Sequence, residues 1–212
     1  MKAVVLLSSG IDSPVAATSI SKYADELIFV HADIQPYSDN VETKTFLLIA
    51  QHLSTLLKRQ IKTFTVSHGQ ALKNYLNKAN KRYTCIFCKR MLLRYADEIA
   101  KRERAGALVM GDSLGQVASQ TLQNIRVIDA VTRYPILRPL IGLDKEDIIL
   151  QAKEMGTFSL STTQMKSCQA VPNKPATQAK LNVVIAEEER INIELLVDQA
   201  VNEAEVSVIH YD

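Results

Sequence analysis

Tryptophan is absent from this sequence of 212 residues, and cysteine, proline and glycine are scarce, at three, six and seven residues. Three cysteines cannot build the disulfide framework of a small secreted protein, and they indicate a reducing, cytoplasmic compartment. No apolar run approaches the length of a membrane span. The apolar run that follows Lys2 is also too short for a secretory signal. The composition therefore excludes secreted disulfide scaffolds and membrane-spanning proteins.

A large excess of charge of either sign is also lacking, since 25 Lys and Arg residues face 23 Asp and Glu residues. This balance excludes a uniformly basic nucleic-acid binder, so any such contact requires local clustering. Apolar residues make up 47% and charged residues 23%, which is typical of globular proteins and excludes long disorder. Because no linker rich in Gly and Ser separates two cores, we expect one domain.

Short β-branched runs predict buried strands, and apolar residues at helical spacing predict helices between them. Strands are predicted at residues 2–8, 26–32, 61–66 and 107–110, with a short one near Val127. Helices are predicted from Asp12, interpreted as an N-cap, to about residue 23, and at 41–58, 68–79, 85–104, 116–123 and 145–155. This alternation predicts an α/β fold with a parallel, doubly wound sheet and helices on both of its faces.

The composition shifts near Thr157. Residues 157–180 are rich in Ser, Thr, Gln and Pro and are expected to form a long loop, whereas residues 187–205 are acidic and expected to be helical. We therefore assign residues 1–156 to a catalytic core. Residues 157–212 are predicted to be a C-terminal loop and helical extension of the same domain.

The segment Ser8-Ser9-Gly10-Ile11-Asp12-Ser13 leads from the first predicted strand into the first helix. Backbone N–H groups and the positive helix end converge at such a turn and attract anions. The segment resembles the S-G-G-x-D-S motif of the PP-loop ATP pyrophosphatases, which cleave ATP between its α- and β-phosphates. Ser9 replaces the first glycine, which is allowed where φ is not positive. In this interpretation Asp12 holds Mg²⁺; a simple helix-capping turn is the alternative.

Three further segments carry a more specific resemblance: residues 83–91 (YTCIFCKRM), 111–121 (GDSLGQVASQT) and 137–145 (LRPLIGLDK). Together they resemble the tRNA 4-thiouridine synthases, also called tRNA sulfurtransferases or thiamine-biosynthesis-type sulfurtransferases, over nearly the whole chain. This resemblance implies a PP-loop fold. It also implies an enzyme that adenylates a tRNA uridine with ATP and then replaces the uridine oxygen by sulfur.

The resemblance also implies which residues act. Asp12 and Cys168 are expected to be catalytic. The expected contacts to ATP and Mg²⁺ are Leu6, Leu7, Ser8, Ser9, Gly10, Asp12, Ser13, His31, Ala32, Lys89, Gly111 and Gln120. Judged singly, His31 could equally be a hydrogen-bonded histidine at a strand end, and Lys89 a solvated charge on a helix.

Cys85 and Cys88 form a C-x-x-C pair at the start of a predicted helix. The positive helix end, Lys89 and Arg90 would favour their thiolate forms. Archaeal members of the family use such a pair, with a later cysteine that matches Cys168, to bind an iron–sulfur cluster, and this implies the same cluster here. A zinc site, a redox disulfide and free buried thiols remain the alternatives.

The charges are unevenly distributed along the chain. Residues 73–104 hold ten basic and three acidic residues, whereas residues 144–212 hold six basic and twelve acidic residues. The basic stretch predicts contact with tRNA phosphates, with a solvated helix face as the alternative. Relatives usually carry an RNA-binding THUMP domain that has no counterpart in this sequence, so we expect a separate THUMP-type chain or a homodimer to assist. The alternative functions are a nucleotide-binding subunit for such a chain, and thiolation of a thiamine-pathway or carrier substrate.

Overall fold

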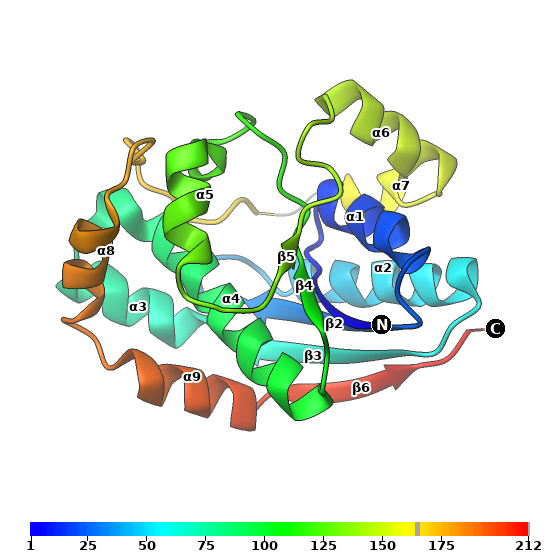
Figure 1. Ribbon diagram of the computed structural model, residues 1–212, viewed down its shortest axis with the longest axis horizontal. Helices are drawn as coiled ribbons and strands as arrows, with labels where there is room; N and C mark the ends of the chain where they lie inside the picture. Colours follow the sequence, from blue (N-terminus) through cyan, green and yellow to red (C-terminus); the bar gives the residue numbers. More distant parts are fainter. Residues whose placement is uncertain (164–165, 212) are drawn as a thin grey trace.

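The computed structural model describes residues 1–163 and 166–211. Its central feature is a six-stranded sheet with the strand order β5-β4-β1-β2-β3-β6 (Figure 1). The strands are β1 (Lys2–Leu6), β2 (Glu26–Asp33), β3 (Ile61–Ser67), β4 (Ala107–Val109), β5 (Ile136–Leu137) and β6 (Glu205–Ile209). Strands β1 to β5 pair in parallel, and β6 pairs antiparallel to β3 at one edge.

Both faces of the sheet are buried, which explains the unbroken apolar run of β1. Successive side chains of a strand point to opposite faces. Accordingly, Val4 and Leu6 belong to one hydrophobic core, and Ala3, Val5 and Leu7 belong to the other. A strand buried on both faces cannot show the alternation of a half-exposed strand. The prediction of a parallel sheet covered on both faces is therefore confirmed.

Helices from distant parts of the chain share each core. On one face lie α1 (Asp12–Ser21), α2 (Val41–Leu57), α6 (Lys145–Glu154) and α7 (Phe158–Ser161). On the other lie α3 (Gly69–Lys78), α4 (Thr84–Glu103), α5 (Leu122–Asp129), α8 (Leu181–Glu188) and α9 (Ile193–Asn202). Short 3₁₀ turns, η1 (Lys81–Tyr83) and η2 (Ala118–Gln120), precede α4 and α5. Within the described ranges, no helix has both the length and the apolar composition needed to cross a bilayer.

Several local predictions are wrong. Val127 lies in helix α5, not in a strand, because it packs with Ile128 into a core shared with α4. The fifth strand is instead β5, whose two residues are too few to give a sequence pattern. Asp12 begins α1 and is not its N-cap, which is Ile11.

The C-terminal part is less purely helical than predicted. After α8 and α9 the chain returns to the sheet and forms β6, which was not among the predicted strands. Its residues are largely exposed, so no buried apolar run marked it. Helix α8 is fastened to α4 by Glu188, which accepts hydrogen bonds from Arg90 and from Arg94. The C-terminal segment is thereby held by backbone pairing at one place and by buried charges at another.

The strand order reverses direction beside β1, since β2 and β3 follow on one side and β4 lies on the other. Ligands of open α/β sheets bind outside the carboxyl ends of the strands at such a point. Here the backbone of Gly111, just after β4, lies against the start of α1. A Cβ atom on Gly111 would lie 2.8 Å from the backbone N of Ser13. Only glycine permits this approach.

We therefore expect Gly111→Ala to lower the free energy of unfolding by about 1–3 kcal/mol, because the new methyl group meets rigid backbone atoms. Urea denaturation followed by circular dichroism measures the change. Gly142→Ala is the matched control, since a Cβ there meets nothing within 4 Å. Equal stability of the two variants would show that the approach of Gly111 to α1 is not tight.

Candidate functional site

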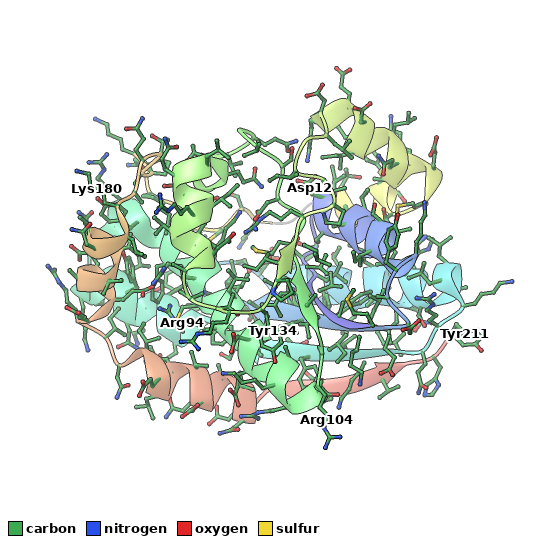
Figure 2. All side chains as sticks on the ribbon, viewed as in Figure 1. Asp12, Arg94, Arg104, Tyr134, Lys180 and Tyr211 are labelled. Atoms are coloured by element: carbon green, nitrogen blue, oxygen red, sulfur yellow. The ribbon has the colours of Figure 1, made fainter. Side chains whose placement is uncertain are left out.

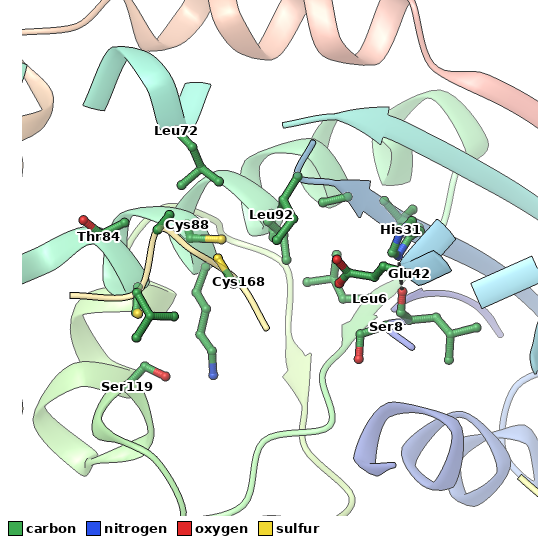
Figure 3. Close-up of a pocket in the computed structure, with 18 residues that line it drawn as sticks. Leu6, Ser8, His31, Glu42, Leu72, Thr84, Cys88, Leu92, Ser119 and Cys168 are labelled. Atoms are coloured by element: carbon green, nitrogen blue, oxygen red, sulfur yellow. Dashed lines mark hydrogen bonds between the residues drawn. The ribbon is translucent and has the colours of Figure 1, made fainter. Parts of the chain in front are cut away.

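A cavity of about 300 Å³ lies at the carboxyl ends of β1 and β2. Figure 3 shows Ser8, His31 and Glu42 on one side of it and Cys88 and Cys168 on the other. Of the predicted nucleotide contacts, six line the cavity: Leu6, Leu7, Ser8, His31, Ala32 and Lys89. All three cysteines, Cys85, Cys88 and Cys168, line it as well. Residues expected to bind ATP and residues expected to handle sulfur thus share one space.

The loop that follows β1 is closed by its two outer serines. The Ser13 hydroxyl accepts a hydrogen bond from the Ser8 backbone N at 2.9 Å and lies 3.0 Å from the Ser8 hydroxyl. The Ser8 hydroxyl in turn accepts from the Gly10 backbone N at 3.2 Å. Ser9 is buried, and it is not among the residues with positive φ in the described ranges. A serine therefore replaces the motif's first glycine without backbone strain.

Asp12 does not line the cavity. It lies at the first turn of α1, near α6, where Figure 2 labels it. Its carboxylate pairs with the ammonium group of Lys145 at the start of α6. The predicted catalytic carboxylate is thus present at the loop, but in this structure its partner is a lysine.

Lys89 and Gln120, two predicted nucleotide contacts, meet at Asp112. The Lys89 ammonium lies 2.6 Å from the Asp112 carboxylate, and the Gln120 amide donates to the same carboxylate at 3.4 Å. Arg138 also donates to it, at 3.1 Å, and pairs with Asp129. Burial raises the pKa of Asp112, but the nearby Lys89 and Arg138 charges outweigh this effect, and the net pKa is below its usual value. Asp112 is therefore an ionised, buried anchor for the cations of the site.

Asp112, Arg138 and Glu42 are site residues that the sequence interpretation did not assign. Asp112 and Arg138 stand within the second and third family segments, so their positions were visible although their roles were not. Glu42 lines the cavity from the first turn of α2 and accepts a hydrogen bond from the Ser38 hydroxyl at 2.6 Å. Burial raises its pKa. Nothing in its local sequence distinguishes it from an ordinary acidic residue at a helix start.

His31 fits both interpretations that the sequence left open. Its ring stacks on Phe46 with the centroids 4.6 Å apart, and its Nδ1 lies 3.3 Å from the Leu7 carbonyl oxygen. It also lines the cavity. Burial lowers the pKa of His31 to about 4, so the ring is neutral at pH 7. It can therefore shape the cavity, but it cannot supply a positive charge to a phosphate.

The structure does not favour the expected thiolate forms of Cys85 and Cys88. All three cysteines are free, and burial raises the pKa of each, for Cys88 to about 12. Lys89 lowers the pKa of Cys85 and Cys88 but does not outweigh burial, and Arg90 pairs with Glu188. The donor type suits an iron–sulfur cluster. However, the described residues include no group of three His, Cys, Asp or Glu side chains gathered as a metal site.

Half of the basic side chains at residues 73–104 are paired with acidic side chains and are not free to bind phosphates. Ion pairs with acidic residues engage five of its ten cations: Lys89, Arg90, Arg94, Lys101 and Arg102. Lys81 and Arg82 are exposed. They line a second hollow together with residues 169–174, the segment that directly follows Cys168 and ends at Lys174. Lys81 and Arg82 are thus the cations of this stretch that lie near the cavity without being in one of these ion pairs.

Comparison with known proteins gives one consistent result. A family model described as "Thiamine biosynthesis protein (ThiI)" matches residues 1–193. A "Probable tRNA sulfurtransferase" of Methanosarcina mazei is 38% identical over 206 residues, which are 97% of this chain and 51% of that protein. One of Thermus thermophilus is 36% identical over 207 residues, again 97% and 51%. The chain spans about half the length of the curated relatives it matches.

Solved structures agree. A structure described as a "4-thiouridine synthetase - RNA complex with bound ATP" is similar with a TM-score of 0.93 and 31% identity, covering 99% of this chain and 55% of that one. An NMN synthetase from Francisella tularensis has a TM-score of 0.57 at 15% identity, covering 94% of this chain and 83% of that one. The second likeness concerns the fold alone.

The anchoring role of Asp112 is testable by pH. Because its folded pKa lies below the usual 3.8, its ion pairs stabilise the fold above that pH and are lost as the pH falls through the folded pKa. Asp112→Asn should therefore cost about 3 kcal/mol at pH 7, and less below pH 4. Guanidinium denaturation across this range measures it. Exposed Asp198→Asn is the control, and a cost independent of pH would contradict the ion-pair account.

Proposed function

The chain belongs to the ThiI family, and from this premise we propose that it is the ATP-dependent catalytic part of a tRNA uridine sulfurtransferase that forms 4-thiouridine. One observation carries the proposal. The cavity at the carboxyl ends of β1 and β2 is lined both by six of the expected nucleotide contacts, Ser8 of the 8–13 loop among them, and by all three cysteines. Residues 1–156 would form the PP-loop core, with residues 157–212 as its extension.

ATP would bind with its phosphates at the 8–13 loop. That loop contains Gly10 and leads into the N-terminal end of α1. The Ser8 and Ser13 hydroxyls are close enough together to donate to one phosphate group. Lys89 lines the cavity and would move from Asp112 to the triphosphate. Asp112 would then keep Arg138 as its partner, so the buried carboxylate would not lose its compensation. Asp12 would leave Lys145 to hold Mg²⁺ on the pyrophosphate.

The adenylation step needs positioning more than covalent help from the protein. The uridine O4 attacks the α-phosphorus, the bond from that phosphorus to the bridging oxygen breaks, and pyrophosphate leaves. The adenylated oxygen is then a good leaving group, and a sulfur nucleophile can displace AMP. An apolar cavity limits water, which would otherwise hydrolyse the adenylate.

For the cysteines we propose a sulfur-handling role with Cys168 as the reacting thiol. Cys85 and Cys88 would either hold an iron–sulfur cluster together with Cys168 or pass sulfur to it. A cluster with three thiolate ligands would offer an open iron site for an extra sulfide. Neutral thiols suit such a role, because each becomes a charged thiolate only when a metal or a sulfur donor displaces the thiol proton. Anaerobic purification followed by visible absorbance and iron analysis distinguishes a bound iron–sulfur cluster from sulfur transfer between the cysteines.

The tRNA would approach at the second hollow, which shares Ala170 and Val171 with the cavity. Lys81, Arg82 and Lys174 line this hollow, and their exposed ammonium and guanidinium groups are available to phosphates. A THUMP-type RNA-binding chain or a second copy of this chain would extend the contact. A tRNA substrate and free thiols both favour a cytoplasmic enzyme.

Two substitutions test the two half-reactions separately. Asp12→Asn should reduce pyrophosphate release from ATP by about 100-fold or more, because it removes a charge at the triphosphate. Cys168→Ser should leave pyrophosphate release within about threefold and abolish thiolated nucleoside, detected by mass spectrometry of digested tRNA. Asp147→Asn, at the matching first turn of α6, is the control. Wild-type thiolation by both test variants would refute the roles proposed for Asp12 and Cys168, whereas absence of thiolated tRNA from the wild-type chain would refute the proposed function.

A salt titration tests the tRNA contact. If Lys81 and Arg82 each bind a phosphate, the double change to alanine should weaken tRNA binding and flatten the slope of log affinity against log salt by about 1–2. Lys101→Ala with Arg102→Ala removes the same charge from α4, where both side chains pair with acidic residues. Filter binding at several salt concentrations compares them. Equal slopes for the two double variants would place the RNA elsewhere.

A further inference from the structure

The loop at residues 166–180 carries Cys168 and is held by backbone contacts at several points. Beside Cys168, the Gln169 N–H donates to the Tyr37 carbonyl at 2.8 Å. Farther along, the Ala176 N–H donates to the Arg82 carbonyl at 2.9 Å. These contacts connect the cysteine loop, as we call residues 166–180, to the segment after β2 and to η1.

A buried side chain of α5 makes a further attachment. Asn124 of α5 is fully buried. Its amide nitrogen donates to the Ala118 carbonyl at 2.7 Å and to the Ala176 carbonyl at 2.8 Å. Its amide oxygen accepts from the Ala179 N–H at 2.9 Å. Next to it, the Thr121 hydroxyl donates to the Thr177 carbonyl at 2.7 Å.

Both segments that Asn124 connects contribute residues to the lining of the cavity. Ala118 begins η2, in which Ser119 lines the cavity and Gln120 donates to Asp112. Ala176 and Ala179 belong to the cysteine loop. An asparagine suits this place because its planar amide offers two donors and one acceptor, and all three are used. Aspartate has the same shape but no donor, so it would face two carbonyl oxygens without a proton to share.

We propose that Asn124 is a positioning residue that fixes the cysteine loop to the η2 segment, so that Cys168 keeps a set distance from Gln120, an expected nucleotide contact. The residue touches neither substrate nor reacting atoms. Its importance for catalysis rests on the proposed function. Its effect on the loop follows from the hydrogen bonds alone.

The reactivity of the cysteines measures this role directly. In the full chain, each cysteine is alkylated with iodoacetamide and quantified by peptide mass spectrometry. Asn124→Asp should accelerate the alkylation of Cys168 by about tenfold or more, because the loop is released from η2. Cys85 and Cys88 lie on α4 and should keep their wild-type rates within about twofold.

Matched variants separate this effect from general loosening. Asn192→Asp should change nothing, because Asn192 caps α9 and aspartate caps a helix equally well. If Asn124→Asp does not fold, Thr121→Val releases the same loop at Thr177, and Thr121→Ser should restore the wild-type rate. An unchanged Cys168 rate in a folded variant, or equal acceleration of all three cysteines, would overturn the proposal.

The alkylation experiment needs neither ATP nor tRNA, so its result stands if the chain does not thiolate tRNA. With tRNA and a sulfide donor, the ratio of thiolated product to released pyrophosphate should fall in Asn124→Asp by about fivefold or more. A wild-type ratio in a variant with a released loop would show that the spacing does not matter for sulfur transfer. Absence of product from the wild-type chain would instead count against the proposed function only.

Discussion

Asp112 places a negative charge in a buried position, and three separate elements of the fold must compensate it. Lys89 comes from α4, Arg138 follows β5, and Gln120 ends η2. An uncompensated buried carboxylate would be protonated or would unfold its surroundings. The three elements are therefore held at fixed distances around the Asp112 carboxylate. Lys89, one of the partners of this carboxylate, also lines the cavity.

The same constraint brings the nucleotide loop into place. Gly111 precedes Asp112 and lies against Ser13, so the end of β4 and the start of α1 cannot separate without disturbing the ion pairs next to them. Ser13 in turn closes the loop on Ser8. A chain of short contacts thus leads from the buried carboxylate to the 8–13 loop, for which we propose phosphate binding. Such a chain favours a preorganised site, whose charges need little rearrangement when a ligand binds.

Burial has opposite consequences for the acids and for the thiols of this region. It is outweighed at Asp112 by two cations, so the carboxylate stays charged. It prevails at Cys88, where the pKa rises to about 12 and the thiol stays neutral. Lys89, whose ammonium lies 2.6 Å from the carboxylate, also lowers the pKa of Cys88, but by less than burial raises it. Any ligand that draws Lys89 away from Asp112 will also change the field at the cysteines.

The sequence alone predicted strands β1 to β4 and the two covered faces of the sheet, because the apolar run of residues 3–7 is typical of a strand buried on both sides. It also predicted a phosphate-binding role for the 8–13 loop, which stays a prediction. It could not determine β6, which is exposed and gains its stability from pairing with β3. Nor could it determine the neutral thiols or the contacts of Asp112 and Asn124. These depend on groups far apart in the sequence, and only the tertiary structure decided which charge meets which partner.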